Sequence, residues 1–151
     1  MISVQTQDFD VAEQYQLLRQ QGEGAIVTFC GLVRDFNQQG KISGLHLEHY
    51  PQMTEQALQQ IVNDARARWP LGNIRIIHRV GELDAGEQIV FVGVTSQHRD
   101  AAFNAAQFIM DYLKTRAPIW KKEKSAQGDQ WVASKNSDIQ AASQWLDKED
   151  S

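Results

Sequence analysis

Apolar residues follow two different periods along the chain, and one of them predicts helices. An apolar stripe at helical spacing begins after Asp8 or Asp10, either of which is a candidate N-cap. A second stripe follows Thr54, the expected N-cap of another helix, and Thr95 or Ser96 is the expected cap of a third. The predicted helices end at residue 19, cover residues 54–69 and 97–114, and close the chain with a short helix at 138–145.

The other period is the alternation, or short apolar run, that is typical of strands. Leu45 and Leu47 alternate with polar neighbours and predict a half-buried strand, whereas Ile89 to Thr95 is the most apolar run and is expected at the centre of a sheet. Because strands and helices do not simply alternate, the expected class is α+β and not a doubly wound fold. The other predicted strands cover residues 2–6, 25–31, 42–50, 74–80, 119–124 and 130–133, the last two as a hairpin, and a turn is expected at 81–87.

Composition narrows the class of protein without identifying it. With 151 residues, 42% of them hydrophobic, and no repeat or linker, the chain is expected to form one domain over residues 1–151. Its pI of about 5.5 argues against nucleic-acid binding by bulk charge. A single cysteine excludes an internal disulfide, and no apolar run approaches the roughly 20 residues of a membrane span. Since the N-terminus lacks a signal-peptide pattern, a cytoplasmic enzyme or binding protein is expected.

Charge is distributed unevenly, and this points to a site. Between His98 and Lys124 there are six Lys or Arg residues and three Asp or Glu residues, a local charge of +3 (6 − 3). The rest of the chain therefore carries −7 (−4 − 3). A cationic region in an acidic protein predicts a site for an anionic ligand, although solvated surface lysines would give the same pattern.

His98 and Arg99 open the third predicted helix, where a cation opposes the helix dipole at a cost of roughly 0.3–1 kcal/mol. A phosphate bound at the helix start would explain them, and simple extension into solvent is the alternative. Arg34, at the end of a strand and before a polar loop, is either another functional cation or an ordinary solvated one.

Lys114 lies close to other cations, which disfavour its charged form and could lower its pKa into the range of a base or nucleophile. Capping of the helix C-terminus is the alternative for it, as it is for Arg116. Arg99 and Lys114 lie 15 residues apart on one helix, or about 22 Å, so no small ligand reaches both within one chain. If both residues are functional, two subunits bring opposite helix ends together, and a homodimer is expected.

Other residues carry weaker signals. His46 and His49 point to opposite faces of a strand and make a poor metal pair, and His78 has no partner recognisable in the sequence. No P-loop, GxGxxG or GxSxG motif is present. Trp120 and Trp131 flank the predicted hairpin, where they would either line a pocket for a flat ring ligand or serve as packing anchors.

Five segments together resemble a known family: TFCGLVRDFN, LEHYPQMTEQAL, ARARWPLGNIRIIHRVGEL, IVFVGVTSQHRDAAF and FIMDYLKTRAPIWKKE. They closely resemble the molybdopterin synthase catalytic (large) subunits, over about Gly24 to Trp145. The combination of an HR pair with KTRAPIWKKE is highly specific for that family.

The resemblance implies an α/β hammerhead-like fold with an additional antiparallel β subdomain. It implies a sulfur transferase of molybdenum cofactor biosynthesis, which converts cyclic pyranopterin monophosphate into molybdopterin by forming a dithiolene. The sulfur would come from the C-terminal thiocarboxylate of a small ubiquitin-like sulfur-carrier subunit, whose Gly-Gly tail enters the large subunit. The implied assembly is a heterotetramer built on a homodimer of large subunits, with no metal and no resident cofactor.

The family's site residues can be carried over by position. Lys114 is implied as the catalytic residue and Lys121 as a second one, while the His98–Arg99 pair would clamp the substrate phosphate. Leu32 would make contact through its backbone, and no role falls on Cys30, because the incoming sulfur belongs to the partner. The complete set of implied substrate contacts is Leu32, Val33, Arg34, His98, Arg99, Lys114, Lys121, Lys122 and Glu123.

Two interpretations of other classes stay open at this point. The same cations could serve a binding module for a phosphorylated metabolite or RNA, or the chain could be a scaffold that holds a ubiquitin-like partner without chemistry. Against RNA stand the acidic net charge and the lack of an aromatic pair on adjacent strands.

Overall fold

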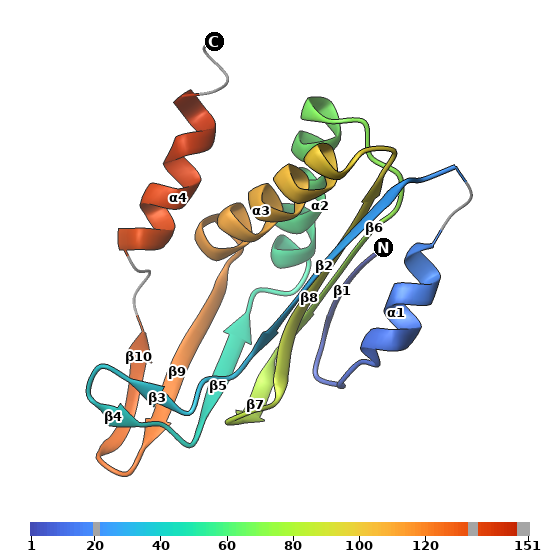
Figure 1. Cartoon of the computed structure of the whole chain (residues 1–151). Helices are drawn as coiled ribbons and strands as arrows, with labels where there is room; N and C mark the ends of the chain where they lie inside the picture. The colour runs from blue at the N-terminus through green and yellow to red at the C-terminus, as the bar shows by residue number, and fades with distance from the viewer. Residues whose placement is uncertain (20–21, 133–135, 148–151) are drawn as a thin grey trace.

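The computed structural model describes residues 1–19, 22–132 and 136–147, and its elements confirm the α+β class (Figure 1). The strands are β1 (Ile2–Gln5), β2 (Ala25–Leu32), β3 (Phe36–Asn37), β4 (Gly40–Lys41), β5 (Gly44–His49), β6 (Ile74–Arg79), β7 (Gly81–Asp84), β8 (Gln88–Ser96), β9 (Ile119–Ser125) and β10 (Gly128–Val132). The helices are α1 (Val11–Leu18), α2 (Met53–Arg68), α3 (Arg99–Arg116) and α4 (Asn136–Asp147).

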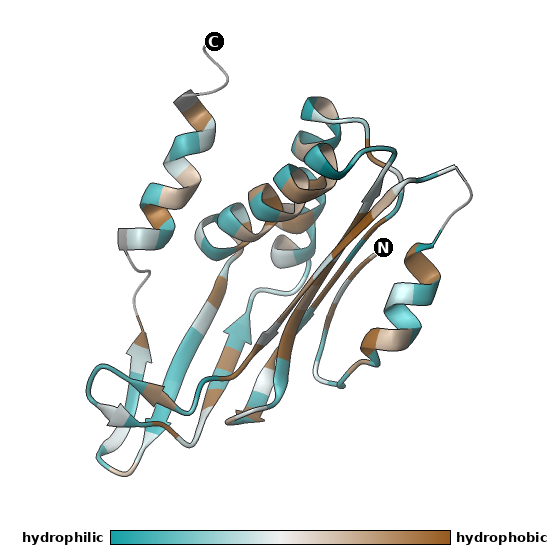
Figure 2. Cartoon of the chain, viewed as in Figure 1, coloured by the Kyte–Doolittle hydropathy of each residue, from teal (hydrophilic) through white to brown (hydrophobic). Residues whose placement is uncertain are grey.

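The main sheet has the strand order β1-β6-β8-β2, with β1 parallel to β6 and the other pairs antiparallel. Helices α2 and α3 cover one face and α1 covers the other (Figure 1). Strand β8 is an interior strand, as expected of the most apolar run, because successive side chains face the two covered sides: Phe91 packs towards α1 and Val92 towards α2 and α3. Figure 2 shows brown, hydrophobic residues concentrated along the strands of this sheet. A side chain at Gly93 would collide with Leu18, so glycine there lets α1 pack close to the sheet.

A second, antiparallel sheet with the order β10-β9-β5-β7 is the additional β subdomain. Leu45 and Leu47 of β5 point into a small core with Val33, Val80 and Leu83. The hairpin expected at the end of this sheet is confirmed, although its last predicted residue, Ala133, lies outside the described residues. The expected turn at 81–87 was wrong in its first half: residues 81–84 pair with β5 as β7, a strand too short to show a periodic pattern.

Two of the expected helix caps were wrong, and one was right. Asp10 caps α1, since its Oδ1 accepts a hydrogen bond from the Glu13 N–H at 3.1 Å. Thr54 lies inside α2, where it is fully buried and its hydroxyl donates to the Tyr50 carbonyl at 2.8 Å. Thr95 and Ser96 belong to β8, and their hydroxyls pair with the backbone of Asn73 and Pro70 instead of capping α3.

Helix α4 is attached to the core through Trp145, whose side chain is 3% exposed. Its indole Nε1–H donates to the Asp111 Oδ2 at 2.8 Å, and its ring lies edge-on to Phe108 and Trp69 at centroid distances of 5.5 and 5.6 Å. These contacts fix one side of the site described below, because the first turn of α4 forms part of its wall.

We expect Trp145→Phe to lower the free energy of unfolding by about 1–3 kcal/mol, because the buried Asp111 carboxylate loses a donor. Denaturant titration would measure this decrease in the free energy of unfolding. The matched control is Trp120→Phe, at a ring that is 45% exposed, where a change within about 0.5 kcal/mol is expected. An equal loss in both variants would contradict this role of the Trp145–Asp111 bond.

Candidate active site

A cavity of about 1220 Å³ lies between the two sheets. Strands β2, β6 and β8 of the main sheet and β5, β9 and β10 of the second sheet contribute to its lining. The wall is completed by the segment of residues 34–42, which includes β3, by the C-terminal end of α3 and by the first turn of α4. A concave site that combines apolar walls with a few charged groups is the usual setting for binding a small molecule.

The cavity brings together five of the residues expected at the site: Leu32, Arg34, Lys114, Lys121 and Glu123. Lys114 arrives from the last turn of α3, and Arg34 follows the end of β2. On β9, Lys121 and Glu123 pair with the buried Leu47 and Leu45 of β5, so their side chains share the inner face of the second sheet. Three cationic side chains therefore meet in one cavity.

The remaining expected contacts lie elsewhere in the chain. Val33 is 3% exposed and is held by backbone hydrogen bonds with Glu87 and Gly86. Lys122 pairs with His46 and faces the opposite side of the sheet, with its Nζ 5.2 Å from the Trp131 ring centroid. The substrate contacts expected of Val33 and Lys122 stay predictions, and neither residue lines the cavity of the described chain.

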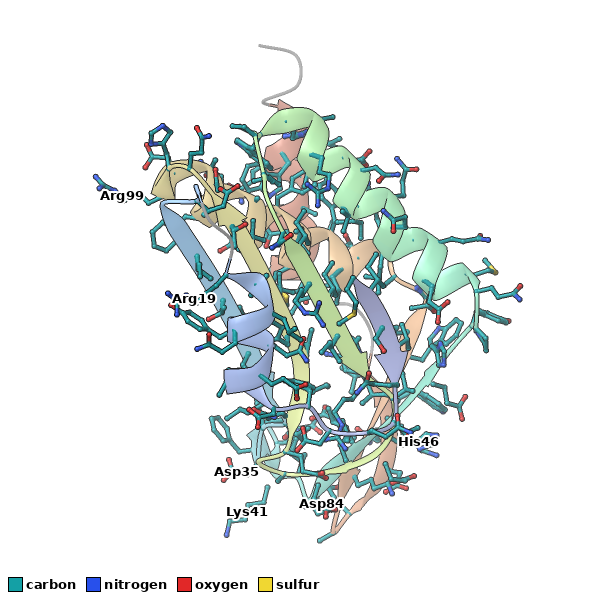
Figure 3. The ribbon with its side chains drawn as sticks, turned by 90° about the vertical axis from the view of Figure 1, so that its right-hand side faces the viewer. Arg19, Asp35, Lys41, His46, Asp84 and Arg99 are labelled. Carbon is teal, nitrogen blue, oxygen red and sulfur yellow. The ribbon has the colours of Figure 1, made fainter. Side chains whose placement is uncertain are left out.

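His98 and Arg99 lie at the far end of α3 from Lys114. Figure 3 shows Arg99 at one end of the molecule, whereas Asp35, next to Arg34, lies at the other. Both His98 and Arg99 are exposed, and His98 takes the N-cap position without a side-chain cap bond. The separation of about 22 Å inferred from helix length agrees with this arrangement, because α3 is one continuous helix.

Three further residues bear on alternatives that the sequence left open. Arg116 forms an ion pair with Asp64 at 3.1 Å and lies over the Tyr112 ring at 3.8 Å, outside the cavity lining, which favours the structural interpretation. Trp131 is among the residues that line the cavity, but it pairs with Lys122 in the sheet, so its ring lies on the outer face beside the Lys122 ammonium. Trp120 contacts Tyr50 edge-on at 5.0 Å, so both rings favour the packing interpretation.

The chain resembles known proteins over most of its length. The family model described as MoaE protein matches residues 4–116. The molybdopterin synthase catalytic subunit of Escherichia coli (strain K12) is 57% identical over 145 residues, which cover 95% of this chain and 97% of that protein. The chain belongs to the MoaE protein family.

Solved structures of MoaE-type proteins share the fold. The molybdopterin biosynthesis MoaE protein from Burkholderia ambifaria MC40-6 superposes with a TM-score of 0.82 at 43% identity, covering 95% of this chain and 96% of that one. One chain of the molybdopterin-converting factor from Helicobacter pylori 26695, solved as a complex of subunits 1 and 2, gives a TM-score of 0.72 at 18% identity, covering 87% of this chain and 89% of that one. The second similarity shows the fold alone.

His78 is a cavity residue of this MoaE chain that reasoning from the sequence missed. It lies on β6, is 6% exposed, and its Nδ1 lies 2.8 Å from the Arg79 carbonyl oxygen. Burial lowers the pKa of His78 to about 4; the bond to Arg79 opposes the shift, and the nearby Lys121 and His49 add to it. Its strand is buried along almost its whole length, so the pattern gave no sign that this histidine reaches a cavity.

The lowered pKa of His78 predicts a loss of stability in acid. Between the ordinary histidine pKa of 6.5 and about 4, the unfolded chain takes up a proton that the folded chain does not. The contribution of His78 to the free energy of unfolding is therefore fully present above pH 6.5 and is lost as the pH falls towards 4. At about pH 4.5 the loss should be about 2–3 kcal/mol, and His78→Gln should remove that part of the difference between neutral and acid unfolding free energies. The control is the half-buried His46, changed to Gln; equal acid sensitivity in wild type and His78→Gln would contradict the assignment.

Cys30 also lines the cavity of this MoaE chain. Burial, with a smaller contribution from the Asp8 carboxylate, raises the pKa of its thiol. Its Sγ lies 3.5 Å from the Gln88 Oε1, as expected of a thiol that donates a hydrogen bond. A protonated thiol is a poor nucleophile, so the geometry supports a packing role for Cys30.

Metal-binding groups and membrane-spanning helices are both missing from the described residues. Across residues 1–19, 22–132 and 136–147, no group of three or more His, Cys, Asp and Glu side chains is placed to hold a metal ion. None of the helices in that part of the chain is long and apolar enough to cross a membrane.

Proposed function

We propose that this chain is the catalytic subunit of a molybdopterin synthase, which transfers sulfur to cyclic pyranopterin monophosphate to form the dithiolene of molybdopterin. The observation that carries the proposal is the meeting of Arg34, Lys114 and Lys121 in one cavity of a MoaE-family chain. Relatives at more than half identity are named molybdopterin synthase catalytic subunit. We place the reaction in the cytoplasm.

The sulfur donor in this proposal is a small ubiquitin-like subunit whose Gly-Gly tail ends in a thiocarboxylate. The tail enters the cavity and its sulfur attacks a carbon of the substrate. A C–S bond forms while a C–O bond at that carbon breaks, the oxygen leaves in protonated form as water or on the opened phosphate ester, and the carrier stays attached through its sulfur. Water then cleaves the acyl–sulfur bond, so the carrier departs with an ordinary carboxylate and the sulfur stays on the substrate. Two such transfers supply the two sulfur atoms. The converting factor from Helicobacter pylori, which shares the fold, was solved as a complex of two subunits, and a second subunit is what this proposal requires.

The cavity suits this chemistry in two ways. Holding the tail and the substrate together replaces an encounter in solution with a positioned reaction. The ammonium groups of Lys114 and Lys121 stabilise the negative charge that develops on oxygen when the acyl carbon is attacked. When the cyclic phosphate opens, a lysine can also act as the acid in its ammonium form or as the base in its neutral amine form.

The assembly in this proposal is a homodimer of catalytic subunits with one small subunit bound to each. The length of α3 supports it, since His98 and Arg99 cannot reach the ligand that Lys114 holds within one chain. A neighbouring subunit would bring its own His98 and Arg99 to the substrate phosphate. The exposure of both residues is what such a shared site requires.

A reconstituted reaction tests the proposed function. The wild-type chain, thiocarboxylated small subunit and cyclic pyranopterin monophosphate are mixed, and the dithiolene product is detected by mass spectrometry. Product should form, and none should form when the small subunit ends in an ordinary carboxylate. Binding of both partners without any product would favour the scaffold interpretation and overturn the proposal.

A further inference from the structure

The imidazole of His78 is a buried polar group in an apolar part of the cavity wall. Its strand neighbours in the sheet, Val4 on β1 and Val90 on β8, are both apolar. Val90 and Leu47 line the same cavity. A polar side chain that is 6% exposed needs a reason to be there, because burying an unsatisfied polar atom costs free energy.

One of the two ring nitrogens of His78 already has a hydrogen-bond partner. The Arg79 carbonyl oxygen can only accept a hydrogen bond, so at 2.8 Å it fixes the proton of the imidazole on Nδ1. In the neutral ring Nε2 then carries a lone pair and can only accept. The hydrogen bond to Arg79 thus turns His78 into an acceptor.

Burial keeps the ring neutral, and nearby charged groups add to the effect. Lys121 of β9 and His49 of β5 act on it electrostatically, and Lys114 of α3 and Glu123 of β9 line the same cavity. With burial as the main cause, the pKa of His78 is lowered to about 4, so the ring is neutral throughout the neutral range. A neutral acceptor beside cationic lysines cannot bind an anion, but it can bind an N–H group.

We propose that His78 is a specificity-determining residue whose Nε2 accepts a hydrogen bond from a ring N–H of the bound substrate, while Lys114 and Lys121 hold the negative charge of that substrate. The inference rests on the proposed function, since the pterin ring of cyclic pyranopterin monophosphate carries such N–H donors. A ligand without a donor fills the cavity but leaves the Nε2 lone pair without a partner, and it is rejected.

Calorimetric binding at neutral pH tests the inference, with the chain assembled with its small subunit in the unreactive carboxylate form. His78→Phe keeps a ring but loses the acceptor, and His78→Gln is the matched control because its side-chain oxygen retains an acceptor. The probes are cyclic pyranopterin monophosphate, a phosphate-free hydroxymethylpterin and inorganic phosphate. His78→Phe should weaken the binding of both pterins about tenfold or more, and His78→Gln should weaken it much less. Neither variant should alter the binding of inorganic phosphate. Wild-type affinity of His78→Phe for the pterins, or an equal loss of phosphate binding, overturns the inference.

A measurement on the wild type avoids dependence on a variant that fails to fold. Nitrogen-15 NMR of the histidine ring should show an unprotonated Nε2 at neutral pH, whose resonance moves when either pterin binds and stays when phosphate binds. A protonated Nε2, or no response to the pterins, overturns the inference. If that happens while the wild type still forms dithiolene, the proposed function stands and only the role of His78 falls. If the wild type neither binds nor converts cyclic pyranopterin monophosphate, both fail.

Discussion

Replacing Lys114 by alanine should reduce dithiolene formation by at least about 10²–10³-fold, the usual cost of removing a group that stabilises charge in the transition state. Lys114 is an exposed side chain at the end of α3 that reaches the cavity shared with Lys121 and Arg34. The small subunit should still bind, because a stable protein–protein interface buries far more surface than one ammonium group provides. Single-turnover product formation with thiocarboxylated partner and saturating substrate would measure the loss.

Arg116→Ala is the matched control for Lys114→Ala. It removes a cation two residues further along the same helix, but one that pairs with Asp64 and does not line the cavity. Its activity should stay within about threefold of wild type, since a surface ion pair contributes only about 0–1 kcal/mol. Full turnover by Lys114→Ala, or an equal loss in both variants, would remove Lys114 from the catalytic assignment.

Two inactive variants should restore activity when they are mixed. In a dimer that combines Arg99→Ala with Lys114→Ala, one of the two shared sites receives the intact residue from each chain, and the other receives neither. Random exchange makes half of the dimers mixed, so recovery of about a quarter of wild-type activity is expected. The measurement is dithiolene formation after subunit exchange has been confirmed by mass spectrometry of the dimers.

Lys114→Ala mixed with Lys121→Ala is the control for complementation. Both residues line the cavity of one chain, so each site of a mixed dimer lacks one lysine and activity should stay at the background level. Recovery in this control would show that mixing acts by another route. No recovery in the first mixture would count against a site shared between subunits.

The sequence predicted the elements that carry the chemistry because their signals are local. The predicted length of this helix placed Arg99 and Lys114 at opposite ends, and the structure confirms that both lie on one helix, α3. The run IWKKEKS of β9 has no apolar alternation, so its pattern could not tell that Lys121 faces the cavity and Lys122 the other side. That choice follows from pairing with Leu47 and His46 of β5, more than 70 residues earlier in the chain.

The wrong predictions of helix caps and the missed cavity position of His78 have the same physical origin. Thr54 is a good N-cap residue by type, yet the chain enters α2 through Gln52 with φ of 69°, and Thr54 is drawn into the core. His78 lies within a strand that is buried on both sides, and only the packing of a second sheet against the first places it at a cavity. Contacts between distant segments decided these cases, and local propensity does not describe them.

Strand β9 exposes two faces that can change independently. Lys121 and Glu123 face the cavity, whereas Trp120, Lys122 and Lys124 form part of the outer surface. A mutation at an even-numbered position of this strand can remodel the exterior, and hence recognition of another protein, while the reaction proceeds unaltered. Substitutions at successive residues of β9 should therefore alternate between two phenotypes, one of assembly and one of chemistry, with the period of the strand itself.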